Sequence, residues 1–513
     1  MDGALMEIGP FRISKNSTIT LNNGTWLNSA NLLFIDQPSN TGFSYSNTFD
    51  KDLDQISFNF YNFLQNYFLI FTQDFSDTVE IYLAGESYAG QYLPFFAEYL
   101  LNNYKDLNLK GVLIGNAWIY PNLQSLSYLP WFKSQNLLSS SIISPNNNTI
   151  NNINNLNLIT QYHNDYSKSK SQLQSQLNDS LLDVNINSQL SCDLILDSLL
   201  NLTRLNNSND INNDCLNIYD YRLRDSYPAC GANWPSDLTN VTPFLSNPHI
   251  QKNLNLNINF NKWAECNSSV SKHLLNQNIK PSFTKLSNLL VNKNLPILLF
   301  NGNKDIICNQ YSLELVTQNL KFDGNNPLKL GFSDSIQYVD WFVKNNSNNN
   351  KKVSYNLLGK IKYENNLYLI EFINASHMVP YDNSIGSLGL LDIFWGNFKW
   401  NSDISHDNQP VIVTPNHPNS FHLSNSIDNS NSNSNFNFNS KNNQTFKDPM
   451  DDNRDTFIGD STLNGLNYFF FIIGSVVVIF YFTIRHFKNR RFTHRNRQPP
   501  LSNIYESYEM IDK

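Results

Sequence analysis

The amino-acid sequence lacks the patterns by which proteins hold metals, cofactors and nucleic acids. Its five cysteines show no C-x-x-C spacing, which excludes the common zinc-binding and thioredoxin-like redox motifs. In the part of the chain before residue 466, no His/Cys cluster has metal-ligand spacing, and neither a glycine-rich phosphate loop nor a basic patch with interleaved aromatic residues is present. We therefore expect no metal site, no cofactor and no nucleic-acid partner.

What the chain does contain is a large supply of aromatic residues. They make up 13% of the 513 residues, and they supply the large buried surfaces that a folded core needs. After about residue 400 the composition becomes rich in Asn, Ser and Asp, without any apolar periodicity. We predict one large domain over 1–400, followed by a flexible stalk over 401–465.

An uncharged apolar run follows the predicted stalk. Residues 466–484 read L-N-Y-F-F-F-I-I-G-S-V-V-V-I-F-Y-F-T-I, nineteen residues without a charge. This is close to the ~20 residues that cross a bilayer as a helix. Basic residues dominate the segment directly after it, and the positive-inside rule places that side in the cytosol. We predict a single-pass type I membrane protein with a lumenal domain and a cytosolic tail over 485–513.

The start of the chain does not agree with delivery into the lumen. Met1-Asp2-Gly3 begins neither a basic region nor the long apolar stretch of a signal peptide. We therefore expect the natural reading frame to start further upstream, with Met1 as an internal methionine.

A strand, a tight turn and a helix surround Ser87. The segment V-E-I-Y-L-A-G over 79–85 alternates and then becomes an apolar strand, and Y-L-P-F-F-A-E-Y-L-L-N-N-Y over 92–104 has helical spacing. The turn between them reads G-E-S-Y-A-G, in which small residues let the strand and helix backbones pass closely. This context predicts a nucleophile elbow that lifts the Ser87 hydroxyl clear of the sheet.

Two further polar residues follow predicted buried strands. P-I-L-L-F-N-G over 296–302 precedes Asp305, and L-Y-L-I-E-F over 367–372 precedes His377. Open α/β sheets bind ligands outside the carboxyl ends of their strands, where both residues are expected. The chain order Ser87, Asp305, His377 is that of the α/β-hydrolases. We predict an α/β-hydrolase fold, a mostly parallel sheet flanked by helices, with a cap inserted at about 122–290.

These segments resemble those of the serine carboxypeptidases. The resemblance rests on D-Q-P-x-x-T-G-F-S-Y at 36–45, G-E-S-Y-A-G at 85–90, G-N-K-D-I-I-C-N at 302–309 and N-A-S-H-M-V-P at 374–380. It implies an enzyme that removes C-terminal residues through an acyl-enzyme intermediate. The roles that it implies are a catalytic triad of Ser87, Asp305 and His377, an oxyanion donor in the backbone N–H of Tyr88, substrate-carboxylate ligands in Glu7 and Glu86, and a site lining that includes Cys308 and Met378.

Within that family, Y-P-A-C-G-A-N-W-P at 227–235, the stalk and the single span are similar to the fungal pheromone-processing carboxypeptidases. The similarity implies removal of C-terminal Lys and Arg from precursor proteins and peptides in the trans-Golgi network. In the predicted tail, Tyr508 and Ile511 have the Y-x-x-apolar spacing of clathrin-adaptor sorting signals, so an adaptor is an expected partner.

The sequence departs from the family at its start. Family members carry W-L-N-G-G-P-G-C-S-S directly before the equivalent of Met1, and that segment supplies part of the carboxylate clamp, an oxyanion glycine and a cysteine. Because this segment is missing, a non-catalytic, membrane-anchored binding protein stays open as an alternative. A carboxypeptidase that prefers hydrophobic C-terminal residues is a second, separate alternative. For the cysteines, the resemblance implies that Cys266 pairs with the upstream segment and Cys308 stays free, with one bridge among Cys192, Cys215 and Cys230.

Overall fold

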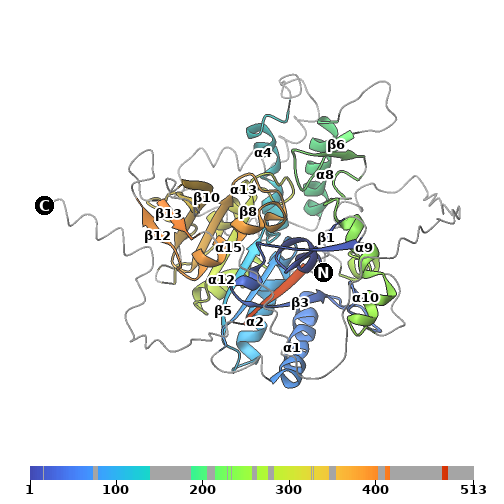
Figure 1. Cartoon of the computed structure of the whole chain (residues 1–513). Helices are drawn as coiled ribbons and strands as arrows, with labels where there is room; N and C mark the ends of the chain where they lie inside the picture. The colour runs from blue at the N-terminus through green and yellow to red at the C-terminus, as the bar shows by residue number, and fades with distance from the viewer. Residues whose placement is uncertain are drawn as a thin grey trace.

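The chain folds around a mixed β-sheet with helices on both of its faces (Figure 1). The computed structural model describes residues 1–14, 17–72, 79–138, 187–204, 214–227, 229–232, 234–256, 263–274, 282–324, 326, 329–345, 354–401, 411–415 and 476–482. Within these residues the sheet has ten strands, in the order β12-β13-β9-β10-β11-β8-β5-β4-β14-β3. Their bounds are β3 (Asn31–Gln37), β4 (Ile81–Glu86), β5 (Leu109–Gly115), β8 (Ile297–Gly302), β9 (Val339–Asn345), β10 (Ser354–Glu364), β11 (Leu367–Phe372), β12 (Lys399–Asn401), β13 (Val411–Thr414) and β14 (Val476–Phe482).

The centre of the sheet is parallel. Strands β4, β5, β8 and β11 are neighbours that run in one direction, so their carboxyl ends meet at one edge. Every residue of β8 is buried, as expected for a strand that is covered on both faces. The loops that leave β4, β8 and β11 at this edge carry Ser87, Asp305 and His377. An α/β-hydrolase-like arrangement of a mixed sheet and helices is therefore present.

The pleat of the strands sends alternate side chains into two separate hydrophobic cores. In β4, Leu83 packs in one core and Ala84 in the other; in β8, Leu299 and Leu298 divide in the same way. The first core receives helices α1 (Leu53–Ile70), α2 (Ala89–Asn103), α12 (Phe283–Val291) and α13 (Gln310–Asn319), and the second receives α15 (Ser384–Phe394). Burial on both faces thus fixes the height and direction of the strand ends that carry the site.

The segment between β5 and β8 makes a long excursion before the chain returns to the sheet. It contains α3 (Pro121–Ser125), α4 (Tyr128–Ser134), α8 (Asn187–Leu202), α9 (Leu238–Leu245), α10 (Pro248–Asn253) and α11 (Ser268–His273), and a small antiparallel pair of β6 (Asp214–Leu216) and β7 (Arg224–Ser226). This is the stretch for which a cap was predicted. Figure 1 shows α8 and β6 together at the top of the view and α9 and α10 at its right side.

Short elements at the beginning and after β11 complete the described chain. The first residues form a π-helical turn, η1 (Gly3–Glu7), then a hairpin of β1 (Phe11–Ser14) and β2 (Thr18–Leu21), and then η3 (Trp26–Asn28). A one-turn helix, α14 (Val379–Asp382), directly follows His377 and Met378. η1 brings Glu7 to the site, and α14 brings Asp382 to the loop that carries His377.

Two predictions for the C-terminal part differ from the structure. The middle of the predicted membrane helix 466–484 forms strand β14, paired antiparallel with β3 and β4. Its sequence, V-V-V-I-F-Y-F, is β-branched and aromatic, and such an apolar run suits a strand as well as a helix. Likewise, residues 411–414 of the predicted stalk form strand β13 of the sheet. All four residues of this V-I-V-T strand are buried. Across the part of the chain that the structure describes, no helix combines the length and the apolar character of a membrane span.

The other C-terminal predictions lie outside the described residues. They include the rest of the stalk, the remainder of the apolar run and the tail with Tyr508 and Ile511.

Candidate active site

Ser87 lies in the turn that joins β4 to α2. The strand ends at Glu86 and the helix begins at Ala89, and Ser87 between them has a φ of 58°. This left-handed conformation is uncommon for a residue with a side chain and must be held by its surroundings. The Ser87 N–H donates to the carbonyl of Gly115, and its own carbonyl accepts from the N–H of Trp118, both at 2.9 Å. The result is a sharp strand-to-helix turn with Ser87 at its apex.

Gly90 and the burial of Ser87 show how tightly this turn is packed. A Cβ on Gly90 would lie 2.7 Å from the backbone N and O of Trp118, so only glycine lets the helix pass there. The Ser87 hydroxyl is buried and makes no hydrogen bond to another described residue. A buried polar group without a partner costs about 1–3 kcal/mol, and such groups call for an explanation in function.

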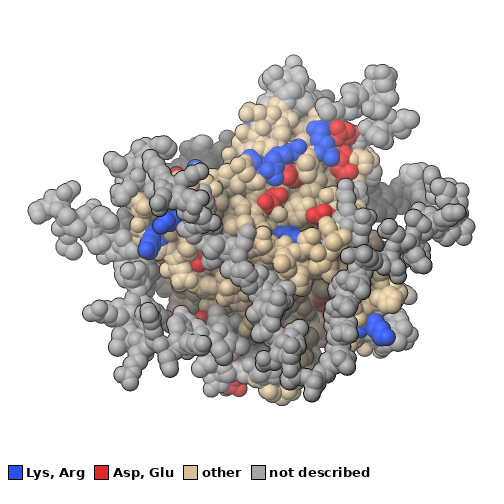
Figure 2. Space-filling model, viewed as in Figure 1, with Lys and Arg blue, Asp and Glu red and all other residues tan. Residues whose placement is uncertain are grey.

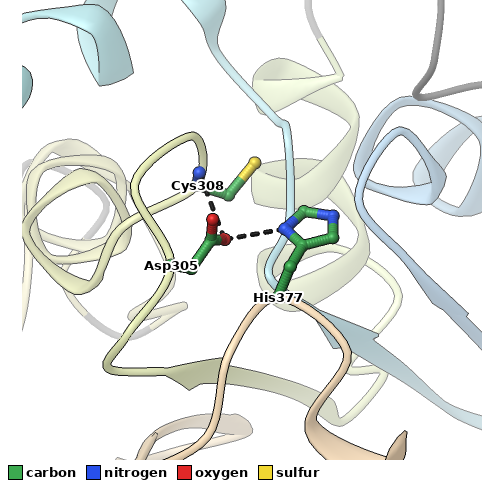
Figure 3. A group of neighbouring side chains, drawn as sticks. All are labelled: Asp305, Cys308 and His377. Atoms are coloured by element: carbon green, nitrogen blue, oxygen red, sulfur yellow. Dashed lines mark hydrogen bonds and ion pairs between the residues drawn. The ribbon is translucent and has the colours of Figure 1, made fainter. Parts of the chain in front are cut away.

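Asp305 and His377 form a hydrogen-bonded pair across the ends of β8 and β11. The Nδ1 atom of His377 lies 2.7 Å from Oδ2 of Asp305, and both side chains are buried (Figure 3). The backbone N–H of Cys308 donates to the same oxygen at 3.2 Å, and that of Ile307 donates to Oδ1 at 3.0 Å. Because these bonds occupy the carboxylate, it is held as an acceptor facing the imidazole, which places the N–H of the ring at Nδ1.

Asn116 is a member of the site that the sequence analysis missed. Its amide Nδ2 donates to Oδ2 of Asp305 at 2.7 Å, and its Oδ1 accepts from the N–H of Gly302 at 3.1 Å. Asn116 directly follows β5, the central parallel strand between β4 and β8. A polar residue at the end of the buried run L-K-G-V-L-I-G was the signal that could have identified it.

Tyr219 is a second missed residue, and it comes from the insertion between β5 and β8. Its carbonyl accepts the N–H of His377 at 2.9 Å, and its ring centroid lies 4.9 Å from that of the imidazole. Tyr219 also stacks on Trp234 at 5.7 Å. The sequence around it has no motif or periodicity, so no signal in the chain could have placed it here.

Glu7 and Glu86 meet although 79 positions separate them in the sequence. Glu7 is buried, Glu86 is partly buried, and their carboxyl groups are hydrogen-bonded to one another. Burial raises the pKa of Glu86 well above its usual range, and the neighbouring Glu7 charge raises it further. Burial also raises the pKa of Glu7, but the hydrogen bond from Glu86 opposes that shift. Glu86 is therefore the protonated donor of a pair that shares one proton.

The pair belongs to the same site as the other acid and base groups. The negative charge of Asp305 contributes to the raised pKa of Glu86, and His377 lowers that of Glu7. Arg12, whose guanidinium donates to the Glu7 carbonyl at 2.8 Å, also favours the ionised form of Glu7. One region at the sheet edge thus combines a hydroxyl, an imidazole–carboxylate pair and a pair of acids that can hold a proton.

The remaining predicted site residues also lie here. Tyr88 caps the N-terminus of the 15-residue helix α2, where backbone N–H groups point outward and the helix dipole is positive. Cys308 carries a buried, reduced thiol, and burial raises the pKa of that thiol well above its usual range. Met378 is buried with Met6 and Trp263 in a third apolar cluster beside the site.

Cys308, Asp305 and His377 lie as close together as the ligands of a metal ion. The sulfur of Cys308 and donor atoms of Asp305 and His377 all lie within 4.8 Å of one another (Figure 3). The described contacts favour proton transfer over metal binding, because His377 Nδ1 is used on Asp305 and the buried thiol stays neutral. The Cys215–Cys230 disulfide, with Cα atoms 5.5 Å apart, supplies the bridge expected among Cys192, Cys215 and Cys230.

Comparison with known proteins places this geometry in a family context. The sequence profile described as serine carboxypeptidase matches residues 1–397. The chain is 41% identical over 405 residues to the pheromone-processing carboxypeptidase KEX1 of Debaryomyces hansenii, covering 78% of this chain and 54% of that protein. Against the protein of the same name from Saccharomyces cerevisiae it is 41% identical over 414 residues, covering 77% of this chain and 53% of that protein. The chain thus spans about half the length of the curated relatives it matches.

A solved structure agrees in backbone as well. The crystal structure of Kex1(delta)p, a prohormone-processing carboxypeptidase from Saccharomyces cerevisiae, superposes with a TM-score of 0.67 at 38% identity. The match covers 81% of this chain and 83% of that one.

Proposed function

The chain belongs to the serine carboxypeptidase family, and we propose that it removes single residues from the C-termini of peptides through an acyl-enzyme intermediate. Ser87 is the nucleophile in this proposal, because its hydroxyl is buried, positioned by a strained turn and without a hydrogen-bond partner among the described residues. A hydroxyl is a weak nucleophile unless a nearby base accepts its proton.

His377 is that base. It takes the proton of Ser87 as the serine oxygen attacks the last peptide carbonyl, and it returns the proton to the leaving amino group. Asp305, 2.7 Å from Nδ1, holds the ring in the required tautomer and stabilises the imidazolium that forms. Water then attacks the acyl-enzyme with His377 again as the base, which releases the shortened peptide and restores Ser87.

The negative oxygen of the tetrahedral intermediate needs donors that are already in place. The backbone N–H of Tyr88, the residue after the nucleophile at the N-terminus of α2, is one such donor. An oxyanion donor of this type contributes about a hundredfold or more to the rate.

The observation that carries the carboxypeptidase assignment is the Glu86–Glu7 pair beside the nucleophile. A serine peptidase that cuts inside chains has no need of two hydrogen-bonded acids beside its nucleophile, whereas an enzyme that recognises a free C-terminus must bind a carboxylate. The proton of Glu86 can be donated to that carboxylate, while Arg12 balances the charge on Glu7. The scissile bond is then the one next to the terminal residue, because Glu86 and Ser87 are adjacent.

For the substrate, we propose precursors that end in Lys or Arg. The support is the resemblance to relatives whose names state pheromone or prohormone processing. The test is hydrolysis of three N-blocked peptides that differ at the end: free Arg, free Phe, and Arg amide. The proposal expects the Arg acid to be cleaved fastest and the Arg amide hardly at all. Preference for Phe would support the hydrophobic alternative, and no hydrolysis together with tight peptide binding would support a binding protein.

For location, we propose the trans-Golgi network, with the catalytic region in the lumen. The support for a single-pass type I anchor comes from the sequence alone, in the uncharged apolar run 466–484 and the basic residues after it. The Tyr508–Ile511 spacing supports retrieval by a clathrin adaptor. Alkaline carbonate extraction tests the anchor. Changing Tyr505 and Tyr508 together to Ala should move the tagged protein to the vacuole or cell surface, and unchanged microscopy would contradict the sorting signal.

A further inference from the structure

One short segment of the insertion contacts both loops that carry the acid and base of the site. We propose that residues 217–222, here called the bracket, position Asp305 and His377 relative to one another, with Arg222 as the positioning residue that reaches the His377 loop. The bracket lies between β6 and β7, far in sequence from both loops. The inference deepens the proposed function and rests on it for its kinetic consequences.

The bracket holds the Asp305 loop through the backbone. The carbonyl of Ile218 accepts the N–H groups of Ile306 and Ile307, at 3.0 and 3.1 Å. The N–H of Tyr221 donates to the carbonyl of Lys304 at 3.0 Å. Asp305 is therefore fastened on both sides by hydrogen bonds from a segment that is not part of the sheet.

The same segment holds the His377 loop, with both backbone and side chain. The Tyr219 carbonyl accepts the N–H of His377 itself, and the Tyr219 ring lies against the imidazole. The side chain of Arg222 extends further: its Nη1 donates to the carbonyl of Asn374 at 3.0 Å. Its Nη2 lies 3.6 Å from Oδ2 of Asp382, and that carboxylate accepts the N–H of Ser376.

The bracket is itself rigid, which a positioning element requires. Arg222 is clamped by Asp220 through a two-point ion pair, with Nε–Oδ1 at 2.8 Å and Nη2–Oδ2 at 2.7 Å. Asn217 and Asp220 are buried, and Oδ1 of Asn217 accepts the N–H of Tyr219 at 2.9 Å. The N–H of Ile218 donates to the carbonyl of Cys230, a partner in the disulfide that closes the segment. Alternative positions for the segment would break several of these bonds at once.

Forming an ion pair does not by itself distinguish Arg222 from the neighbouring Arg224. Figure 2 shows charged side chains of both signs gathered over the region of α8 and β6, as expected for ion pairs rather than for a binding patch of one sign. Two ion pairs among the described residues of the insertion are Arg222 with Asp220 and Arg224 with Asp214, and Arg222 also lies 3.6 Å from Asp382. Both arginines have an acid and a backbone carbonyl as partners, but Arg224 donates to Thr203, away from the site. Of these two arginines, Arg222 is the one that connects its ion pair to the loop of the base.

The expected effect is partial, because the two loops also contact one another directly. The N–H of Lys304 donates to the carbonyl of Ala375 at 2.8 Å. Loss of Arg222 should thus loosen the His377 loop without releasing it. Displacements of about 1 Å in a catalytic group can cost about a hundredfold in rate, so we expect kcat to fall about ten- to a hundredfold.

The test compares Arg222→Ala with the matched control Arg224→Ala in the full-length protein. The bracket predicts that Arg222→Ala lowers kcat on the Arg-ended peptide while KM changes less than about threefold, since positioning acts on the chemical step. The side chain of Arg222 is 39% exposed, so free guanidinium can enter the vacated place. Millimolar guanidinium chloride should restore kcat in Arg222→Ala, and equal sodium chloride should not. Arg222→Lys should recover little, because lysine cannot form the two-point pair.

A second readout does not depend on turnover. The proton on Nδ1 of His377, shared with Asp305, gives a low-field proton resonance whose position reports that hydrogen bond. It should shift or broaden in Arg222→Ala, return with guanidinium, and stay unchanged in Arg224→Ala. An Arg222→Ala protein with wild-type kcat and an unchanged resonance would overturn the bracket. Wild-type protein that hydrolyses no peptide would instead overturn the proposed function, while the resonance still decides the bracket.

Discussion

The Glu86–Glu7 pair makes the most distinctive prediction, because in the proposed function its shared proton is donated to the substrate carboxylate. In Glu86→Gln the carboxyl donor is replaced by an amide that donates at every pH. At acidic pH the protonated carboxyl of wild-type Glu86 is a stronger hydrogen-bond donor than the amide of the variant. The acceptor is the charged substrate carboxylate for either donor, and hydrogen bonds to charged groups contribute about 1.5–3 kcal/mol, so the weaker amide donor should cost at most the width of that range, about 1.5 kcal/mol. That corresponds to about a tenfold lower kcat/KM.

In Glu86→Gln, the pH dependence of kcat/KM should change more than its maximum value does. The pKa of Glu86 is raised by burial and by Glu7, so the wild-type donor is present under acidic conditions and is lost as the pH rises through that raised pKa. Above it, two carboxylates would face the carboxylate of the substrate, and kcat/KM should fall about tenfold for each pH unit. The side-chain amide in Glu86→Gln does not titrate, so the alkaline fall of kcat/KM should be absent or much shallower in the variant.

The assay is kcat/KM from about pH 4.5 to about pH 8, a range that spans a raised carboxyl pKa, for an N-blocked Arg-ended peptide and for its amide. Only the acid substrate presents a carboxylate, so only its profile should change in Glu86→Gln. Asp197→Asn is the matched control, because Asp197 is a half-buried acid in α8 whose pKa burial also raises, and it is hydrogen-bonded to Asn201 away from the site. Wild-type and Glu86→Gln profiles of the same shape, or equal loss on the amide, would refute the reasoning.

Three further predictions concern the nucleophile, the packing of the loops and stability. Ser87→Ala and His377→Ala should each lower kcat about 10⁴-fold or more because the triad acts as a unit, and equal fluorophosphonate labelling of Ser87→Ala and wild type would contradict the assignment of Ser87. A Cβ on Gly302 would stand 1.9 Å from the carbonyl oxygen of Ser376, so Gly302→Ala should displace the His377 loop and lower both the melting temperature and kcat; a variant as active and stable as wild type would show that the loop can move freely. Because the folded-state pKa of Glu86 is raised from the ordinary 4.5, its contribution to stability is complete below that value and is lost as the pH rises through the raised pKa. The melting temperature should therefore fall less steeply above that ordinary pKa in Glu86→Gln than in wild type, and parallel curves would argue against a shared buried proton.

Much of the site was predictable because its residues stand at the ends of recognisable local elements. An alternating and apolar strand, a turn of small residues and a helix identified Ser87 without any tertiary information. The strands before Asp305 and His377 were short apolar runs of the kind that parallel sheets bury, and strand ends in such sheets converge at one edge. In these cases the information lies in spacing along the chain, which the sequence displays directly.

Other features were decided only by the tertiary structure. Asn116 bonds Asp305 across 189 positions, and the contact depends on β5 lying between β4 and β8, an order that no local pattern contains. The apolar run around 476–482 was predicted as helix from its length and lack of charge, yet its β-branched residues pair between β3 and β4. The bracket has no motif at all, since its contacts are mostly backbone hydrogen bonds that any residue can make. Sequence by itself determined which groups carry chemistry here, and the packing of the sheet and its insertion determined which of them meet, because hydrogen bonds between distant segments leave no periodic trace in the chain.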